Sequence, residues 1–102
     1  MTANELKESV KISIKSIDPK ARIILFGSRA RGDSKKSSDW DFLILTSKQV
    51  NSNYKKQILN KLLDTELEAE EVINSLIFSI DKWRNYKITP LYQNISKEGI
   101  EL

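Results

Sequence analysis

The chain has 102 residues, of which 39% are hydrophobic and 30% are charged, and this balance is typical of one globular domain over residues 1–102 rather than of a disordered chain. It contains no cysteine and no histidine, which excludes disulfide bonds, thiolate metal sites, histidine-based nucleophilic catalysis and most zinc chemistry. The net charge of +3 permits contact with phosphate groups, and the lack of a membrane-length apolar run or an apolar leader predicts a cytoplasmic protein with no membrane partner.

Residues 4–17 are predicted to form an amphipathic helix. Thr2 or Asn4 is expected to cap its start, and Asp18-Pro19 to end it. Apolar residues recur along it at helical spacing, which predicts that this helix covers one face of a sheet: Leu6, Val10, Ile14 and Ile17.

The stretch that follows predicts a strand and then a tight turn. Residues 23–26 form a short, continuous apolar run rich in β-branched residues, as expected of a buried strand. Gly27 and Ser28 stop the run and offer bare backbone and a hydroxyl where the chain turns. A polar connector leads from this turn to the next apolar run.

Residues 39–45 predict a second strand, which carries two carboxylates. Side chains alternate across a strand, so Asp39 and Asp41 point to one face, roughly 6–7 Å apart along the backbone. Two carboxylates together suit a hard divalent cation such as Mg²⁺, which prefers oxygen ligands and binds beside substrate phosphates. The opposite face is wholly apolar and is expected to enter the core.

The second half of the chain predicts a helix, a strand and two further helices. The helix spans residue 54 to about 68, with a core stripe of Ile58, Leu59, Leu62 and Leu63 and with Leu67 near its end. The strand covers residues 72–80, and Asp81 is expected to cap a short helix after it. Pro90 begins the last helix and Gly99 stops it.

Three side chains are predicted to dock the last helix on the domain, namely Leu91, Ile95 and Ile100, although Tyr92 and residues 100–102 are alternatively available to a partner. Trp83 is expected to plug the core, with nucleobase stacking as the alternative. Basic and aromatic residues do not interleave as in a single-strand platform, so direct binding of nucleic acid is not expected.

Residues 27–41, G-S-R-A-R-G-D-S-K-K-S-S-D-W-D, resemble the signature of the minimal nucleotidyltransferases of the DNA polymerase β-like superfamily. That signature consists of Gly-Ser, a basic-small-basic-Gly run, and Ser-Asp-x-Asp before apolar residues. The resemblance implies an α/β (α+β) fold with a short mixed sheet flanked by helices. It also implies a Mg²⁺-dependent nucleotidyltransferase that uses a nucleoside triphosphate such as ATP.

The same resemblance implies roles for individual residues. Asp39 and Asp41 would be the catalytic residues and Mg²⁺ ligands, and the residues that would bind nucleotide are Gly27, Ser28, Arg29, Arg31 and Ser38. For the two arginines, an ion pair with Asp33 or exposure to solvent remains an equal alternative.

The predicted third strand departs from the family pattern. Complete relatives carry a third acid on this strand, facing the Asp-x-Asp pair, whereas the matching place here falls around Asn74-Ser75. Two carboxylates and a triphosphate suffice to hold one Mg²⁺. Without a third carboxylate, however, the site lacks a further ligand for a second metal and a side chain that could act as general base.

Three functions follow as hypotheses. The first is transfer of a nucleoside monophosphate, AMP from ATP, to a hydroxyl acceptor such as a HEPN-domain toxin, because relatives are often encoded beside such a partner. The second is an antitoxin with little or no catalysis that acts by binding its partner. The third is modification of a small molecule of the aminoglycoside type, against which the short chain argues.

Overall fold

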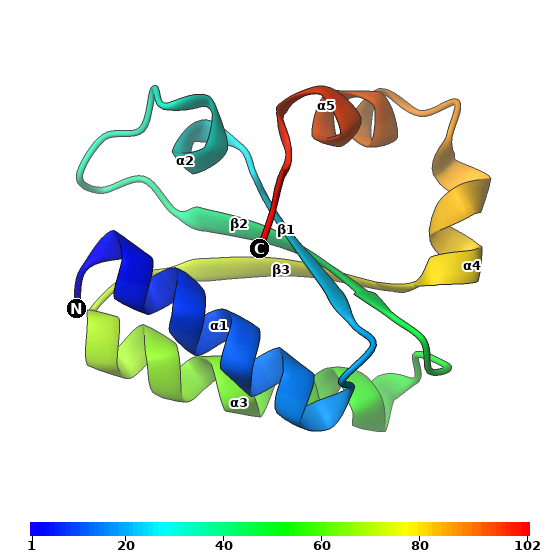
Figure 1. The fold of residues 1–102 in the computed structure, drawn as a ribbon, viewed down its shortest axis with the longest axis horizontal. Helices are drawn as coiled ribbons and strands as arrows, with labels where there is room; N and C mark the ends of the chain where they lie inside the picture. Colours follow the sequence, from blue (N-terminus) through cyan, green and yellow to red (C-terminus); the bar gives the residue numbers. More distant parts are fainter.

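The computed structural model describes all residues from 1 to 102, and it arranges the helices in two layers about one sheet (Figure 1). The elements in chain order are α1 (Ala3–Ile17), β1 (Arg22–Phe26), α2 (Ser28–Arg31), β2 (Trp40–Thr46), α3 (Ser52–Ala69), β3 (Ile73–Ser79), α4 (Ile80–Trp83), the 3₁₀ turn η1 (Arg84–Tyr86), α5 (Pro90–Glu98) and β4 (Ile100–Glu101). This is the predicted α/β fold with a short mixed sheet. No helix is long and apolar enough to cross a membrane.

The sheet has four strands in the order β3-β2-β1-β4. β1 pairs antiparallel with β2 and with β4, whereas β2 and β3 run parallel and are joined through α3. A parallel pair needs a crossover connection, commonly a helix, and α3 provides it. The end of β1 and the starts of β2 and β3 therefore lie at the same end of the sheet.

One face of the sheet packs on α1 and α3, which lie below the sheet in Figure 1. The central strand β2 contributes Trp40, Phe42 and Ile44 to this core, all 5% exposed or less, as its alternation predicts. The helices contribute side chains at helical spacing, namely Leu6, Val10 and Ile14 from α1 and Tyr54, Ile58 and Leu62 from α3. Burying a side chain the size of Phe42 stabilises the fold by about 1.5–3 kcal/mol.

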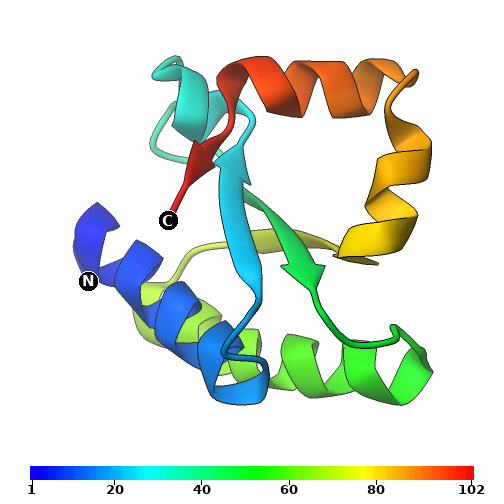
Figure 2. The ribbon, with the colours of Figure 1, turned by 45° about the vertical axis from the view of Figure 1, so that its right-hand side comes forward.

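The other face is covered by α4, η1 and α5, which frame the sheet from above and from the right in Figure 2. Leu43 and Leu45 of β2 pack here against Trp83 and Ile95, so every residue of β2 except Asp41 is buried. Trp83 is 7% exposed and its ring lies 5.0 Å from that of Tyr92. The prediction that Trp83 plugs the core is confirmed.

A buried polar cluster ties the end of α1 to the end of β2. The Asp18 carboxylate accepts hydrogen bonds from Thr46 Oγ1 at 2.7 Å and from the Ser47 N–H at 2.8 Å, and it also caps the turn through the Lys20 N–H. Burial raises the pKa of Asp18, but these hydrogen bonds outweigh it and lower the pKa to about 2. Asp18 is therefore charged and fully partnered in the fold.

The caps of the first two long helices agree with their sequences. Thr2 and Glu5 form a capping box, in which the Thr2 side chain accepts from the Glu5 N–H and the Glu5 carboxylate accepts from the Thr2 N–H. Of the two caps predicted for this helix, Thr2 is therefore the one used. Asn51 caps α3 with a single hydrogen bond, in which its side-chain oxygen accepts the Tyr54 N–H, so that α3 begins before the predicted Tyr54.

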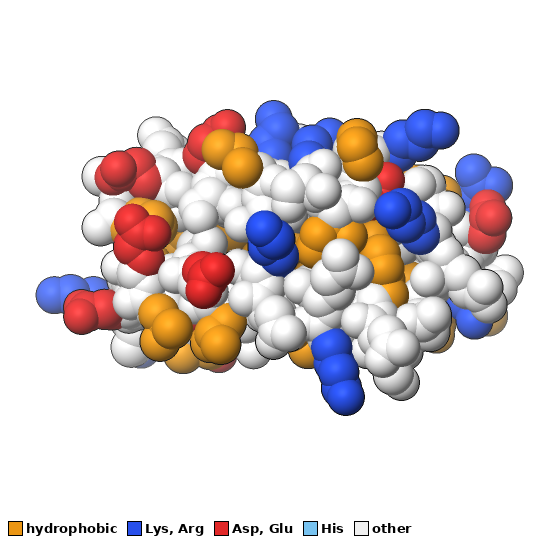
Figure 3. Space-filling view, turned by 90° about the horizontal axis from the view of Figure 1, so that it is seen from below, with side chains coloured by type: hydrophobic (Ala, Val, Ile, Leu, Met, Phe, Trp, Pro, Cys, Tyr) orange, Lys and Arg blue, Asp and Glu red, His pale blue; other side chains and the backbone are white.

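The predicted core stripe of α3 is half wrong. Ile58 and Leu62 are buried, but Leu59 and Leu63 are 50% and 48% exposed, and Leu67 is 69% exposed. The apolar residues of α3 are too many for one narrow stripe, and the face centred on Tyr54, Ile58, Leu62 and Thr65 enters the core instead. Figure 3 shows the resulting surface from below, where hydrophobic side chains lie among charged ones.

Two predictions near the C-terminal end are also wrong. Ser79, not Asp81, caps α4, because β3 ends at Ser79 and its side chain accepts from the Lys82 N–H. Only Ile95 of the three predicted docking residues is buried, whereas Leu91 is 40% and Ile100 is 45% exposed. Ile100 and Glu101 instead form β4, which extends the sheet beside β1.

Candidate active site

The candidate site lies where three strands meet at one end of the sheet. Phe26 at the end of β1 pairs with Asp41 of β2, and Asp41 pairs with Asn74 of β3. Gly27 and Ser28 follow Phe26 directly, so the Gly-Ser turn, the carboxylates and Asn74 are brought to one row across the sheet. Strand pairing thus unites residues from distant parts of the chain.

Asp39 and Asp41 converge on a single amide. The Nδ2 of Asn74 donates to Asp39 Oδ2 at 3.0 Å and to Asp41 Oδ1 at 3.3 Å. Asp39 was predicted to begin this strand, but it lies one residue before β2 and is exposed, whereas Asp41 is half-buried. The two side chains share a face and approach the same point, as the alternation predicts.

Asn74 stands where complete relatives of the resembled family are expected to carry the third acid. The register places it directly beside Asp41. An amide is neutral at every ordinary pH, so it adds no charge to the pair and cannot serve as a general base. No cluster of three or more acidic, histidine or cysteine side chains exists that could hold a metal ion.

Gly27 allows the turn to lie directly against Asp41. Its φ is +75° and its ψ is −159°, a conformation that is essentially restricted to glycine. A Cβ on Gly27 would lie 2.3 Å from Asp41 Oδ2, which is closer than atoms can approach. The bare backbone of the turn and the carboxylate therefore form one compact surface.

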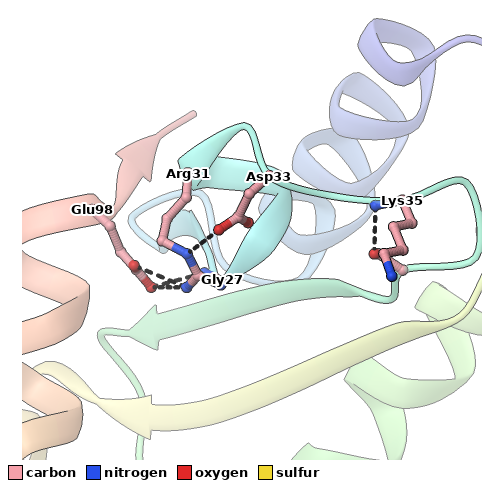
Figure 4. A network of polar contacts seen from close by, with 6 residues as sticks. Gly27, Arg31, Asp33, Lys35 and Glu98 are labelled. Carbon is pink, nitrogen blue, oxygen red and sulfur yellow. Dashed lines mark hydrogen bonds and ion pairs between the residues drawn. The ribbon is translucent and has the colours of Figure 1, made fainter.

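The turn leads into α2, which Arg31 ends. The Arg31 guanidinium pairs with Asp33 Oδ2 at 3.2 Å and with Glu98 Oε2 at 3.1 Å (Figure 4). The hydrogen bonds that Arg31 donates to Glu98 and, second, to Asp33 raise the pKa of Arg31 further above its usual value. The alternative of an ion pair with Asp33 is thus present in the structure, together with a second acid from α5.

Glu98 also contacts the Gly-Ser turn itself. Its Oε1 accepts the backbone N–H of Gly27 at 3.0 Å, and its side chain is 19% exposed (Figure 4). Sequence reasoning did not identify Glu98, because the residue is 71 positions from Gly27 and belongs to no motif. Its place just before the Gly99 stop gives no signal of this contact.

The Arg29 side chain makes several contacts within the fold. Its guanidinium lies 4.6 Å from the centre of the Trp40 ring and donates to the Ser38 carbonyl at 2.9 Å and to the Lys36 carbonyl at 3.3 Å. Its side chain is 16% exposed and lies 3.8 Å from Glu71. Arg29 therefore holds the connector in place, and neither of its predicted alternatives, an ion pair with Asp33 or exposure, describes it.

Ser38 shapes the same connector. Its hydroxyl oxygen accepts the Lys35 N–H at 2.8 Å, which is the dashed line at Lys35 in Figure 4. Its carbonyl accepts from Arg29. The Ser38 hydroxyl and the Ser38 carbonyl therefore both make hydrogen bonds that shape the loop leading to Asp39.

The donor set at Asp39 and Asp41 fits a divalent cation. Two carboxylate oxygens already share one electropositive partner, the Asn74 amide, at hydrogen-bonding distance. Oxygen ligands of this kind suit Mg²⁺, which binds proteins through one or two carboxylates and completes its shell with water and phosphate oxygens. Turning the amide over would present the Asn74 carbonyl oxygen to the same point, as a neutral third ligand.

The chain matches a known family over almost its whole length. The model of the nucleotidyltransferase domain family covers residues 6–100, which includes the entire site described above. Two curated relatives from Methanocaldococcus jannaschii, which bear the names "Putative protein adenylyltransferase MJ0141" and "Putative protein adenylyltransferase MJ0604", agree with it. MJ0141 is 32% identical over 82% of this chain and 90% of its own length, and MJ0604 is 34% identical over 94% and 85%.

Solved structures share the fold. One, described as a toxin–antitoxin with AMP-PNP, has a TM-score of 0.63 and 22% identity over 92% of this chain and 70% of its own. Another, described as the toxin–antitoxin MntA-HpeT in a variant with two aspartates changed to glutamate, has a TM-score of 0.63 and 17% identity over 99% and 72%. With these matches and the Gly-Ser turn beside the Asp-x-Asp pair, the chain belongs to the nucleotidyltransferase domain family and is of the minimal nucleotidyltransferase type.

Proposed function

We propose that this chain transfers AMP from ATP to a hydroxyl on a partner protein, a toxin of the HEPN class. The observation that carries the proposal is the convergence of Asp39 and Asp41 on one point beside the Gly27 backbone. The assigned activity of the M. jannaschii relatives supports adenylate as the transferred group. The toxin–antitoxin assemblies among the structural neighbours support a protein partner.

The residues of the site have distinct roles in this proposal. The Gly27-Ser28 turn, with its bare backbone and hydroxyl, binds the β- and γ-phosphates, and Arg31 at the end of α2 offsets their charge. Asp39 and Asp41 hold Mg²⁺, and the chemistry that the bound ion supplies is neutralisation of the charge that develops on the phosphates. Arg29 and Ser38 keep the connector, and so Asp39, in position.

The reaction forms a bond from the acceptor oxygen to the α-phosphorus and breaks the bond from that phosphorus to pyrophosphate. The hydroxyl must lose its proton, and Asn74 cannot take it because an amide is not basic. Asp39 and Asp41 are assigned to the Mg²⁺ ion, so the proton passes to water. This gap in general-base catalysis predicts slow transfer, since a positioned base typically contributes about 10²–10⁴-fold to the rate.

The test is intact-mass measurement of the partner after incubation with this chain, ATP and MgCl₂. The partner to test first is the protein whose gene lies next to the gene for this chain. We expect the partner to gain the mass of whole AMP units, and we expect Asp39→Asn and Asp41→Asn to abolish the gain while the fold is retained. Transfer that persists in both variants would show that the carboxylates are not the catalytic residues.

Asn74 favours a second candidate, an antitoxin that binds its partner without modifying it. Under this alternative Asp39→Asn still binds and silences the partner, and no mass gain is seen with the wild type. Asn74→Asp decides further between the two functions, because it supplies a third carboxylate beside Asp41. If the wild type is a slow enzyme, this variant should be faster at saturating Mg²⁺, whereas Asn74→Ala should not.

A further inference from the structure

We propose that Glu98 acts as a built-in competitor of nucleotide phosphate, because α5 places its carboxylate on the backbone N–H of Gly27 and on the Arg31 guanidinium. This inference rests on the proposed function, which assigns the triphosphate to the same turn. Glu98 is thereby an affinity-determining residue, and nucleotide must displace it or share its partners.

The contacts of Glu98 are those that a phosphate would make. A backbone N–H and a guanidinium are common partners of both carboxylates and phosphates, and both bind through charge-assisted hydrogen bonds. Glu98 Oε1 lies 3.0 Å from Gly27 N and 3.3 Å from Arg31 Nη1, and Oε2 lies 3.1 Å from the same nitrogen. One carboxylate thus engages both groups of the turn region at once.

The position of Glu98 is fixed by the fold. It is the last residue of α5, and β4 begins two residues later and pairs with β1. Gly99 between them is packed so closely that a Cβ there would lie 2.7 Å from Ile24 Cγ2. The end of α5 is therefore held against the strand that delivers Gly27.

While Asp33 and Glu98 both pair with Arg31, their negative charges offset the positive charge that its guanidinium would present to a ligand. Asp33 is its second partner, but the Asp33 side chain is 61% exposed and belongs to the connector after α2, whereas the Glu98 side chain is 19% exposed. The more buried acid is screened less by solvent and competes more strongly. Glu98 is for this reason the residue to change.

The experiment compares the wild type, Glu98→Gln and the matched control Glu101→Gln. Glu101 is a second acid of the same segment, but it pairs with Arg22 at 2.7 Å, away from the turn. Binding of ATP with MgCl₂ is measured by calorimetry, and thermal unfolding without nucleotide verifies that each variant folds. Gln keeps an oxygen for the Gly27 N–H while it removes the charge.

We expect Glu98→Gln to bind ATP roughly three- to tenfold more tightly than the wild type, which corresponds to about 0.7–1.4 kcal/mol. Glu101→Gln should bind as the wild type does. In ¹⁵N–¹H spectra, the Gly27 amide should shift on adding ATP, and Gly32, one of only three glycines in the chain, should serve as the reference.

Equal or weaker binding by folded Glu98→Gln would overturn the inference and make Glu98 a positioning residue, while the proposed function would stand. ATP binding by Glu98→Gln but not by the wild type would support the inference in its strongest form. Failure of both proteins to bind ATP would overturn the proposed function and, with it, this inference.

Discussion

Replacing Gly27 by alanine should damage the fold and the carboxylate site together, and Gly32 offers a matched control. Both glycines have positive φ, +75° and +85° respectively. A Cβ on Gly32 meets nothing within 4 Å, whereas a Cβ on Gly27 would lie 2.3 Å from Asp41 Oδ2. Both substitutions thus place alanine in an unfavourable backbone conformation, but only Gly27→Ala also creates a steric clash with Asp41.

The magnitudes follow from the geometry of the two positions. Gly32 has ψ of 10°, a left-handed conformation that other residues adopt at a cost of about 1 kcal/mol. Gly27 has ψ of −159°, in a region that costs of order 1–3 kcal/mol for other residues, and the displacement of Asp41 adds to this. In a domain of this size, 1 kcal/mol corresponds to a shift in Tm of roughly 4–8 °C.

The assay is thermal unfolding of both variants, followed by titration with Mn²⁺ as a spectroscopic substitute for Mg²⁺. We expect Gly32→Ala to lose roughly 4–8 °C in Tm and to bind Mn²⁺ as the wild type does. Gly27→Ala should lose at least twice as much and should bind Mn²⁺ more weakly. If the two variants matched in both Tm and Mn²⁺ affinity, the close approach of the turn to Asp41 would be refuted.

Two further predictions concern stability away from the site. Leu62→Ala should lower the free energy of unfolding by about 2–5 kcal/mol, because Leu62 is 1% exposed. Leu63 is 48% exposed, so Leu63→Ala should change the free energy of unfolding by about 0.5 kcal/mol or less. Urea unfolding measures both values, and equal losses would contradict the assignment of the two faces of α3. Asp18 has a folded pKa of about 2 against 3.8 when unperturbed, so its charge contributes about 2 kcal/mol above pH 4 that is lost as the pH falls toward 2. The difference in the free energy of unfolding between the wild type and Asp18→Asn should therefore shrink as the pH falls from 4 toward 2. A difference that stayed constant from pH 7 to pH 2 would show that the charge of Asp18 does not stabilise the fold.

Apolar runs, alternation and helical spacing were sufficient to predict three of the four strands and the core face of β2, but not β4. They predicted that Asp39 and Asp41 share a face, and both carboxylates do accept from Asn74. They failed on α3, because leucines occur on both sides of the helix and only packing decides between them. Local rules cannot choose among apolar faces of similar strength.

The contacts that cross long stretches of sequence were beyond such reasoning. Glu98 reaches Gly27 only because β4 pairs with β1 and α5 is carried along. Arg29 stacks on Trp40 because α2 folds back over the start of β2, which a motif of basic and small residues does not reveal. Charge in a motif therefore does not by itself indicate a ligand contact.

The two tryptophans lie on opposite faces of the sheet. Trp40 lies in the core beneath α1 and α3 with Arg29 over its ring, and Trp83 lies in the core beneath α5. In a Trp83→Phe protein, all indole emission would come from the residue between Asp39 and Asp41. Fluorescence of the unlabelled protein would then report changes around Trp40, without emission from a second indole.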